Sequence, residues 1–479
     1  MNTTSANIVA KRSVVEKSSI ALALDSNDKA AIRRYQKNTP KPDISHIPGD
    51  NGLPFLGHFF PFVNDIHGWL DKQYQQHGPV FKFRSPIIDA VVLIGPEANK
   101  LAFQNEGQIL SNYLAWSPTF ETLFDNSLLA RDFKDHKIHR KTLQAAFKRP
   151  AIEGHMALMN PLIKDDLATW PKGKTINSMN HIKTLLLNAG ANVFLGSKTG
   201  ENTDKINQAF IDIVAGTSDP IRSKAIWFSP YAKGVKGNKT ISKYIFDNIK
   251  ERRATESRDM FSYLCNLRDD NGELMSDKAI RDNLIFLLFA AHDTTTSALS
   301  AVLYALASNP DWQEELREEM LGLNKEFLEF DDIDKMEKTS WTISEALRMY
   351  PALHGMPRYA LKEFEFKGHT IPANSNILVS AVMSHYMPEY WTAPYTFDPL
   401  RFSPERAEDK KDFYQYIPFG GGAHKCLGMH FAQVQAKMFL FYLLKSNRVS
   451  KDPKMTSYKV NRVPLAFPTD GLPLKFTAI

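Results

Sequence analysis

The sequence predicts a single large domain that is mainly α-helical and carries small peripheral β-sheets. Helix-type patterning dominates from about Pro96 to Ala352, while the β-rich runs on either side of it are short. No internal linker divides the 479 residues, so one large domain is a simpler interpretation than two or three average ones. Hydrophobic residues make up 43% and charged residues 23% of the chain, which is ordinary for a globular protein with a large core.

The first 45 residues predict a polar extension ahead of a domain that spans residues 46–479. Ser, Thr, Asn and Lys are frequent up to Pro42, and the apolar run from Ile20 to Leu24 is too short for a signal-peptide core. Turn-forming residues between Ile47 and Pro54 then mark the start of the ordered domain. We expect the extension to be mobile or loosely docked.

The central helix is the clearest element of the domain. Ser276-Asp277 supplies its N-cap, apolar residues follow at helical spacing, and Asn309-Pro310 ends it. About 32 residues would extend roughly 50 Å, which is enough to cross the whole domain. The other expected elements are a hairpin of Val80 to Arg84 with Ala90 to Ile94, short strands at Glu363 to Lys367 and Ile377 to Ser380, a helix from His430 to Leu444, and a terminal strand pair of Val463 to Phe467 with Leu472 to Thr477.

Charge and cysteine content narrow the class of protein. Lys and Arg number 59 against 53 Asp and Glu, and this excess of +6 is spread along the chain, so it predicts no nucleic-acid partner. The two cysteines, Cys265 and Cys426, form no disulfide framework, which fits a cytoplasmic protein. The longest apolar stretch of the central helix, Leu284 to Ala291, is far below the ~20 residues of a membrane span, so we expect no transmembrane segment.

Cys426 lies in the glycine-rich loop Phe419-Gly-Gly-Gly-Ala-His-Lys-Cys-Leu-Gly428. A thiolate that binds haem iron must be reached by a flat macrocycle, and glycines such as Gly420 and Gly428 allow the backbone to lie close to it. The spacing Phe-x-x-Gly-x-x-x-Cys-x-Gly resembles the haem-binding signature of the cytochrome P-450 monooxygenases. The alternative is an ordinary glycine-rich turn with an inert cysteine.

A polar block, His292-Asp293-Thr294-Thr295-Thr296, interrupts the apolar central helix. Threonine hydroxyls can bond back to the preceding turn, so the block indicates a local distortion or a water-filled notch. It resembles the family's acid-threonine pair, which implies that Asp293 and Thr294 relay protons on the distal side of the haem. A cap or kink without chemical role is the alternative. Ala291 replaces the glycine usual in the family and adds a methyl group near the oxygen-binding notch.

Two further motifs resemble the family's pattern. Glu345 and Arg348 resemble its Glu-x-x-Arg helix, and Arg401, in Phe-Asp-Pro-Leu-Arg-Phe, resembles the arginine that completes that network. Their implied role is structural support of the cysteine loop. Cations that would face the two haem propionates are His136 and Arg140, four residues apart on one predicted helix, with Arg358 and His424.

By this resemblance, which covers roughly residues 46–479, the chain is similar to the cytochrome P-450 family, with the fold of that family. The resemblance implies a haem-thiolate catalytic domain with haem b (iron protoporphyrin IX), ligated by Cys426 with Phe419 packed near the sulfur. It implies a monomeric monooxygenase that inserts one oxygen atom of O2 into a hydrophobic small molecule, by hydroxylation or oxidative demethylation. Because no flavin domain can be placed in the remaining residues, electrons are expected from a ferredoxin or flavodoxin-type donor with its reductase.

The substrate pocket implied by the resemblance is aromatic and apolar, which favours a sterol-, retinoid-, terpenoid- or fatty-acid-like substrate. Its expected lining residues are Tyr113, Trp116, Phe120, Phe124, Phe289, Ala290, His354, Met356 and Phe467. Three rival functions stay open: a haem-binding sensor, a peroxide-dependent isomerase or peroxygenase, and a helical scaffold without haem. The Asp293-Thr294 pair argues against the first two, and the haem content of the purified protein would decide the third.

Overall fold

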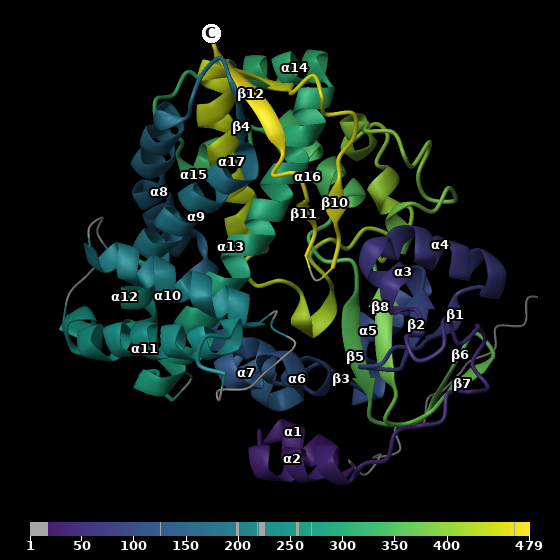
Figure 1. The fold of residues 1–479 in the computed structure, drawn as a ribbon. Helices are drawn as coiled ribbons and strands as arrows, with labels where there is room; N and C mark the ends of the chain where they lie inside the picture. Colours follow the sequence, from purple (N-terminus) through teal and green to yellow (C-terminus); the bar gives the residue numbers. More distant parts are fainter. Residues whose placement is uncertain are drawn as a thin grey trace, which may run out of the picture.

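The computed structural model describes residues 18–124, 126–197, 201–217, 219, 226–254, 258–269, 271–463 and 465–479; the side chains of residues 119–123, 201 and 202 lie outside that description. One side of the molecule is built from helices and the other contains the main sheet (Figure 1). This agrees with the predicted mainly α-helical class with small sheets.

The helical side is organised around α13 (Asp277–Ser308), the predicted central helix. The Ser276 hydroxyl accepts a hydrogen bond from the Ala279 amide, and the helix ends at Asn309, so both predicted ends are confirmed. Most of its side chains are buried, because other helices surround it. The other helices of this side are α8 (Arg149–Thr169), α9 (Ser178–Leu195), α10 (Glu201–Thr217), α11 (Pro230–Ala254), α12 (Met260–Asn266), α14 (Pro310–Gly322), α15 (Phe330–Ile333), α16 (Glu337–Met349) and α17 (Met429–Ser446).

The main sheet has five strands in the order β1-β2-β8-β5-β3. The predicted hairpin is confirmed, since β1 (Val80–Phe83) and β2 (Ala90–Ile94) pair antiparallel. The β8 strand (Asn376–Ser380) runs parallel to β2 and antiparallel to β5 (Met356–Ala360), and β3 (Leu110–Ser111) closes the edge. A smaller pair, β6 (Phe364–Phe366) and β7 (His369–Ile371), lies in the connection between β5 and β8.

Seven further helices of the described chain lie on the sheet side and in the lower part of the view in Figure 1. They are α1 (Ser19–Asp25), α2 (Lys29–Asn38), α3 (Phe59–Asn64), α4 (Ile66–His77), α5 (Pro96–Gln104) and α6 (Tyr113–Phe124), and α7 (Phe133–Gln144) follows them. The polar composition of residues 1–45 predicted no helix, whereas α1 and α2 are regular helices with N-caps from Ser18 and Asp28. Residues 1–17 lie outside the described part of the chain.

The prediction of a terminal strand pair is wrong. The last strand, β12 (Pro473–Ala478), pairs with β9 (Asn447–Lys451) and β4 (Thr175–Asn177), not with the segment from Val463 to Phe467. That segment ends in β11 (Phe467–Pro468), which forms a two-stranded hairpin with β10 (Val460–Asn461). The longer pairing with β9 places Leu474 and Phe476 in the core, where both are fully buried.

Candidate active site

The cysteine loop lies immediately before α17. The Cys426 amide donates to the Phe419 carbonyl at 2.9 Å, and the Gly420 amide donates to the Ile417 carbonyl at 2.9 Å, so the loop closes on itself. The Cys426 side chain is exposed, while Phe419 and Leu427 pack against the main core. Solvent reaches the Cys426 sulfur, yet protein occupies most of the space around it, and this desolvation raises the pKa of the thiol, whereas the Gly428 amide, Arg140 and Lys425 favour the thiolate.

The glycines before the cysteine are explained by packing on α5. A Cβ atom on Gly422 would lie 1.8 Å from the Phe103 carbonyl oxygen, and one on Gly421 would lie 3.1 Å from the Phe103 ring. Gly422 also has a φ of 61°, in the left-handed region. The sequence argument assigned these glycines to close approach of a macrocycle, whereas the structure shows close approach of the loop to α5.

The four residues expected to face the propionates gather near the loop. The His136 and His424 rings stack at 3.9 Å between centroids. Arg358 is buried, and its Nη1 donates to Asn112 Oδ1 at 3.1 Å and to the Pro357 carbonyl at 2.8 Å, which are uncharged acceptors. Burial lowers the pKa of Arg358 to about 10 and that of His136 to about 2. Arg140 lies near Cys426, and burial lowers the pKa of its guanidinium while the cysteine raises it.

Asp132 is a buried carboxylate beside His424, and sequence reasoning missed it. One of its carboxylate oxygens accepts from the Ser111 hydroxyl at 2.5 Å and the Tyr113 amide at 3.1 Å. The other accepts from the Asn112 amide at 3.0 Å and lies 3.4 Å from His424 Nε2. Asp132 precedes α7 as its N-cap residue, so one buried carboxylate joins β3, α6, α7 and the cysteine loop.

The middle of α13 has one face that is less buried than the rest. Phe286, Ala290, Thr294 and Ala298 recur every four residues and are half-buried, while most of the helix around them is buried. We call these four residues the open stripe. Phe289 flanks it and packs on Phe124 of α6 at 4.8 Å between ring centroids, and Phe286 lies 6.0 Å from the same ring.

Of the predicted proton-relay pair, Thr294 belongs to the open stripe, and Asp293 is its neighbour in the chain on the side of α9. The Thr294 hydroxyl donates to the Ala290 carbonyl at 2.7 Å, which confirms the expected back-bonding of a helical threonine. Asp293 is buried, with His292 Nδ1 at 3.0 Å and Lys183 Nζ of α9 at 3.5 Å from its Oδ1. Burial alone would raise the pKa of Asp293, but His292 and Lys183 outweigh it, so that pKa lies below its ordinary value.

The structure brings Glu345, Arg348 and Arg401 together in a network that is at most 1% exposed. Arg348 donates to Glu345 through Nε at 2.7 Å and Nη2 at 2.9 Å, and Arg401 Nε donates to it at 3.3 Å. Sequence reasoning missed Glu408, which accepts from Arg401 Nη1 at 3.2 Å. These acids compensate two fully buried guanidinium groups.

His385 connects this network to the cysteine loop. Its carbonyl accepts from Arg348 Nη1 at 2.7 Å, and its ring Nε2 accepts from the Ile417 amide at 3.2 Å. Ile417 in turn anchors Gly420. Burial, then Arg348, lowers the pKa of His385 to about 3, so the ring is neutral and can accept this hydrogen bond.

The predicted substrate-pocket residues divide into two groups. The first group lies around the expected site. Phe124, Phe289 and Ala290 lie at the open stripe, and Trp116 is half-buried on α6. Met356 packs near Gly420, and Phe467 is half-buried with Lys183 Nζ 4.4 Å from its ring centre. Tyr113 and His354 make other contacts: Tyr113 packs on α1 and α2, and His354 Nε2 lies 2.8 Å from Arg462 Nη1 in the β10–β11 hairpin. The Phe120 side chain lies outside the described part of the chain.

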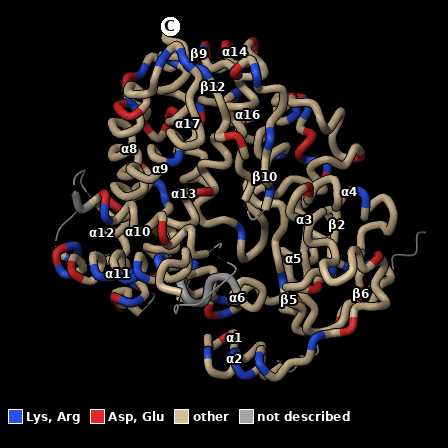
Figure 2. The backbone as a smooth tube through the Cα atoms, in the orientation of Figure 1, with Lys and Arg blue, Asp and Glu red and all other residues tan. Residues whose placement is uncertain are grey.

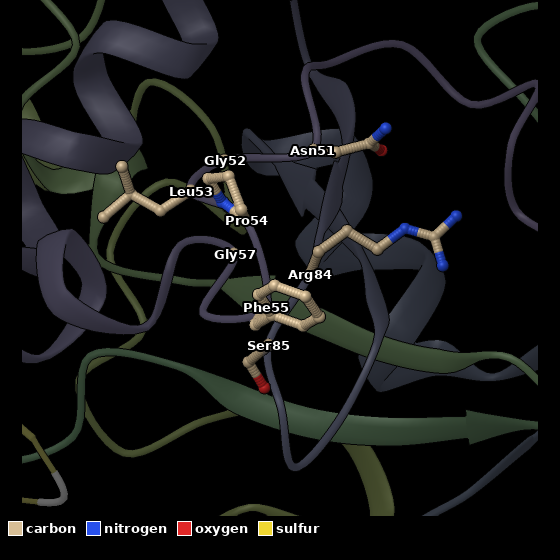
Figure 3. A pocket seen from close by; sticks show the side chains of 8 residues that line it. All are labelled: Asn51, Gly52, Leu53, Pro54, Phe55, Gly57, Arg84 and Ser85. Carbon is tan, nitrogen blue, oxygen red and sulfur yellow. The ribbon is translucent and has the colours of Figure 1, made fainter.

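A hollow at the surface lies apart from these residues (Figure 3). It is lined by Asn51, Gly52, Leu53, Pro54, Phe55, Gly57, Arg84 and Ser85. Arg84 is the one charged residue in this described lining, and it pairs with Asp89 at 2.6 Å. None of the predicted site residues borders the hollow, so the hollow is not part of the candidate active site at Cys426.

The residues around Cys426 fit a haem. An exposed cysteine, a half-buried apolar stripe and a buried arginine bound to uncharged oxygens match the thiolate ligand, the flat ring and the propionates of that group. Across the described residues, His, Cys, Asp and Glu form no cluster of three or more that could hold a metal ion alone. Cys426 would supply the thiolate ligand, and His136, Arg140, Arg358 and His424 would face the propionates.

Comparison with known proteins agrees with this geometry. The family model described as "Cytochrome P450" matches residues 47–476. Cytochrome P-450 136 of Mycobacterium tuberculosis is 30% identical over 94% of this chain and 92% of its own length. Taxoid 7-beta-hydroxylase of Taxus cuspidata is 28% identical over 90% and 89%. The solved structure of retinoic acid-bound cyanobacterial CYP120A1 superposes with a TM-score of 0.81 at 26% identity, covering 92% of this chain and all of that one.

The family match spans nearly the whole chain, and the similar structure has the same single-domain, mainly helical fold. The chain therefore belongs to the cytochrome P-450 family and is a haem b-containing monooxygenase of that family.

Proposed function

We propose that this monooxygenase acts on a rigid, hydrophobic isoprenoid-type molecule of the retinoid, terpenoid or sterol kind. The observation that carries the proposal is the aromatic wall at the open stripe, where Phe124, Phe286 and Phe289 pack together one to two turns before Thr294. Such a wall favours apolar surface and offers no charge to a polar substrate. A taxoid hydroxylase and a structure with bound retinoic acid among the similar proteins support the same substrate class.

The roles of Asp293 and Thr294 follow from their surroundings. The Thr294 hydroxyl donates its hydrogen bond to the Ala290 carbonyl, so its oxygen is left to accept a hydrogen bond from a water at the stripe. Asp293 is ionised at neutral pH, and Lys183, one third exposed, lies between it and the surface. We assign the pair to proton delivery. Bound haem supplies the oxidising chemistry that transfers one oxygen atom of O2 to the substrate.

Members of the family receive electrons from a redox partner, and we assign a ferredoxin or flavodoxin-type donor with its reductase to this chain. The support is electrostatic: Lys137 and Lys141 of α7 and Lys425 of the cysteine loop are exposed beside the predicted ligand. Elsewhere, acidic and basic residues are interspersed over the molecule (Figure 2). This mixture gives no support to a nucleic-acid partner.

We also propose that residues 46–479 form the catalytic domain and that residues 1–45 are an extension. The protein is assigned as a monomer in the cytoplasm. Both cysteines are free, which is consistent with a reducing compartment. Within the described residues, α13 is the one helix long and apolar enough to cross a membrane, and two thirds of its most apolar stretch is buried by the rest of the protein, as expected of a core helix.

The test begins with the carbon monoxide difference spectrum of the dithionite-reduced protein. A Soret band at the long wavelength of thiolate-ligated haem is expected, and its absence would overturn the haem assignment. The oxidised protein is then titrated with all-trans retinoic acid and, separately, with decanoate as an unbranched carboxylate control. A spin-state change with the isoprenoid ligand alone supports the substrate class, whereas an equal or stronger response to decanoate contradicts it.

A further inference from the structure

The N-terminal helices α1 and α2 are built into the domain. Ile32 of α2 is fully buried, and Leu24 of α1 is 2% exposed. Together with Ile20 and Ala23 they form a separate apolar core with Tyr113 and Leu114 of α6, Ala130 and Leu361. Figure 1 shows the two helices beneath α6 and α7, far along the chain from the elements that surround Cys426. We call this pair of helices, residues 19–38, the N-terminal clasp.

The clasp contacts the first half of α6 through polar groups as well. Lys29 Nζ lies 4.0 Å above the centre of the Tyr113 ring and donates to the Ala130 carbonyl at 3.3 Å. Gln36 Nε2 donates to the Ser117 hydroxyl at 2.9 Å, one turn further along α6. Both contacts therefore fix α6 from the side of the clasp.

The clasp also contacts the start of α7. Asp25 Oδ1 accepts a hydrogen bond from the Lys134 amide at 3.1 Å. Lys134 is two residues from Asp132, the carboxylate that joins β3, α6, α7 and His424, and two from His136. The clasp therefore supports both α6, which borders the expected substrate pocket, and α7, which carries two of the residues expected to face the propionates.

The opposite end of α6 reaches the open stripe. Phe124, its last residue, is 1% exposed and packs on Phe286 and Phe289 of α13. Tyr113, Ser117 and Phe124 belong to the same helix, which also contains Pro118, so loss of the contacts at Tyr113 and Ser117 would favour local opening of α6 and loosen the aromatic wall at Phe124.

We infer that the N-terminal clasp positions α6 over the active site, and that Ile32, Lys29 and Gln36 are positioning residues that determine how bulky ligands bind. The inference rests on the proposed function, because it concerns the pocket wall of that same site. It gives residues of the predicted polar extension a role in substrate binding.

The experiment compares Ile32→Asp, which places a charge in the buried core of the clasp, with Leu22→Asp, the same type of change on α1 at a position that is 55% exposed. Two probes are titrated into the oxidised, haem-loaded proteins: imidazole, which needs only the iron, and clotrimazole, an imidazole with a bulky triarylmethyl group that must also fit the pocket. If Ile32→Asp leaves α6 in its native position about a tenth of the time, clotrimazole affinity falls about tenfold. Imidazole affinity and both affinities in Leu22→Asp should be unchanged.

Amide hydrogen exchange supplies a readout that needs no haem. Faster exchange in α6 of Ile32→Asp, but not of Leu22→Asp, is expected. Unchanged clotrimazole affinity, an equal loss for imidazole, or unchanged exchange in α6 would overturn the inference. If Ile32→Asp fails to fold, the milder Lys29→Ala/Gln36→Ala variant decides in the same way, because it leaves the apolar core intact. If the parent protein shows no thiolate-haem band, the proposed function fails while the exchange comparison still tests the clasp.

Discussion

Neutralising Glu345 tests whether the buried ionic network stabilises the fold and the cysteine loop. Glu345 accepts four hydrogen bonds, from Arg348 Nε and Nη2, Arg401 Nε and the Asp398 amide, and it is fully buried. In Glu345→Gln the amide NH2 group would face guanidinium donors, and one of two buried positive charges would lose its carboxylate. Breaking a buried ion pair costs roughly 3–5 kcal/mol. Because Arg401 keeps Glu408, we expect a loss near the lower end, about 3 kcal/mol.

The measurement is urea denaturation of the haem-loaded protein at neutral pH, followed by tryptophan fluorescence. The matched control is Asp247→Asn, which removes the carboxylate of the exposed Lys243–Asp247 pair on α11 and should cost far less. Because His385 joins Arg348 to Ile417 and the loop, Glu345→Gln should also lose its thiolate-type spectrum at a lower temperature than the control. A loss of stability no greater than that of Asp247→Asn would refute the reasoning.

Three further predictions concern the site and its pH dependence. Cys426→Ala removes the only sulfur in the loop, so the reduced, carbon monoxide-bound protein should lose the thiolate-type Soret band while its far-ultraviolet circular dichroism is retained; an unchanged band would exclude Cys426 as ligand. Asp293→Asn should keep that band but lower turnover about 100-fold, the usual size of a lost general acid–base contribution, and Thr294→Ala should divert electrons into peroxide or water; normal coupled product formation in both would contradict the proton-delivery role. Burial holds the pKa of His155 at about 4, below its ordinary 6.5, so the unfolded chain binds a proton there before the folded protein does. Its stability contribution is complete above pH 6.5 and is lost as the pH falls toward 4, by roughly 2 kcal/mol at pH 5. His155→Leu should therefore show a smaller drop in unfolding free energy between pH 7 and pH 5 than the parent, and an equal drop would contradict the assignment.

Elements with a strong local signal could be predicted from the sequence. The ends of α13 follow from Ser276 and Asn309-Pro310, and the β1–β2 hairpin follows from two β-rich runs around a turn. The cysteine loop and the acid–threonine pair could be found because each is a short, contiguous motif. The terminal pairing could not, because β12 passes over the adjacent β10–β11 hairpin and pairs with β9 before it and with the distant β4, and strand runs alone do not encode partners.

The site residues that were missed act at long range. Asp132 contacts Ser111 and His424, and His385 contacts Arg348 and Ile417, and the local sequence does not indicate these partners. A signal for Asp132 existed in its position just before the predicted helix of His136 and Arg140, where an N-cap acid is expected. For α1 and α2, polar composition concealed a narrow apolar face of Ile20, Leu24 and Ile32 that only the tertiary contacts with α6 explain.

The open stripe limits how α13 can change in evolution or in design. Successive residues of an α-helix are rotated by about 100°, so one residue inserted between Ser276 and Phe286 would turn every later side chain onto a different face. Thr294 and Ala298 would then move to the buried positions that Thr295 and Leu299 now hold, and Asp293 and Ser297 would take their places on the open stripe. Relatives with altered substrates should therefore vary in the identity of the stripe residues and in the loops around α13, while the number of residues from the N-cap to the threonine stays constant.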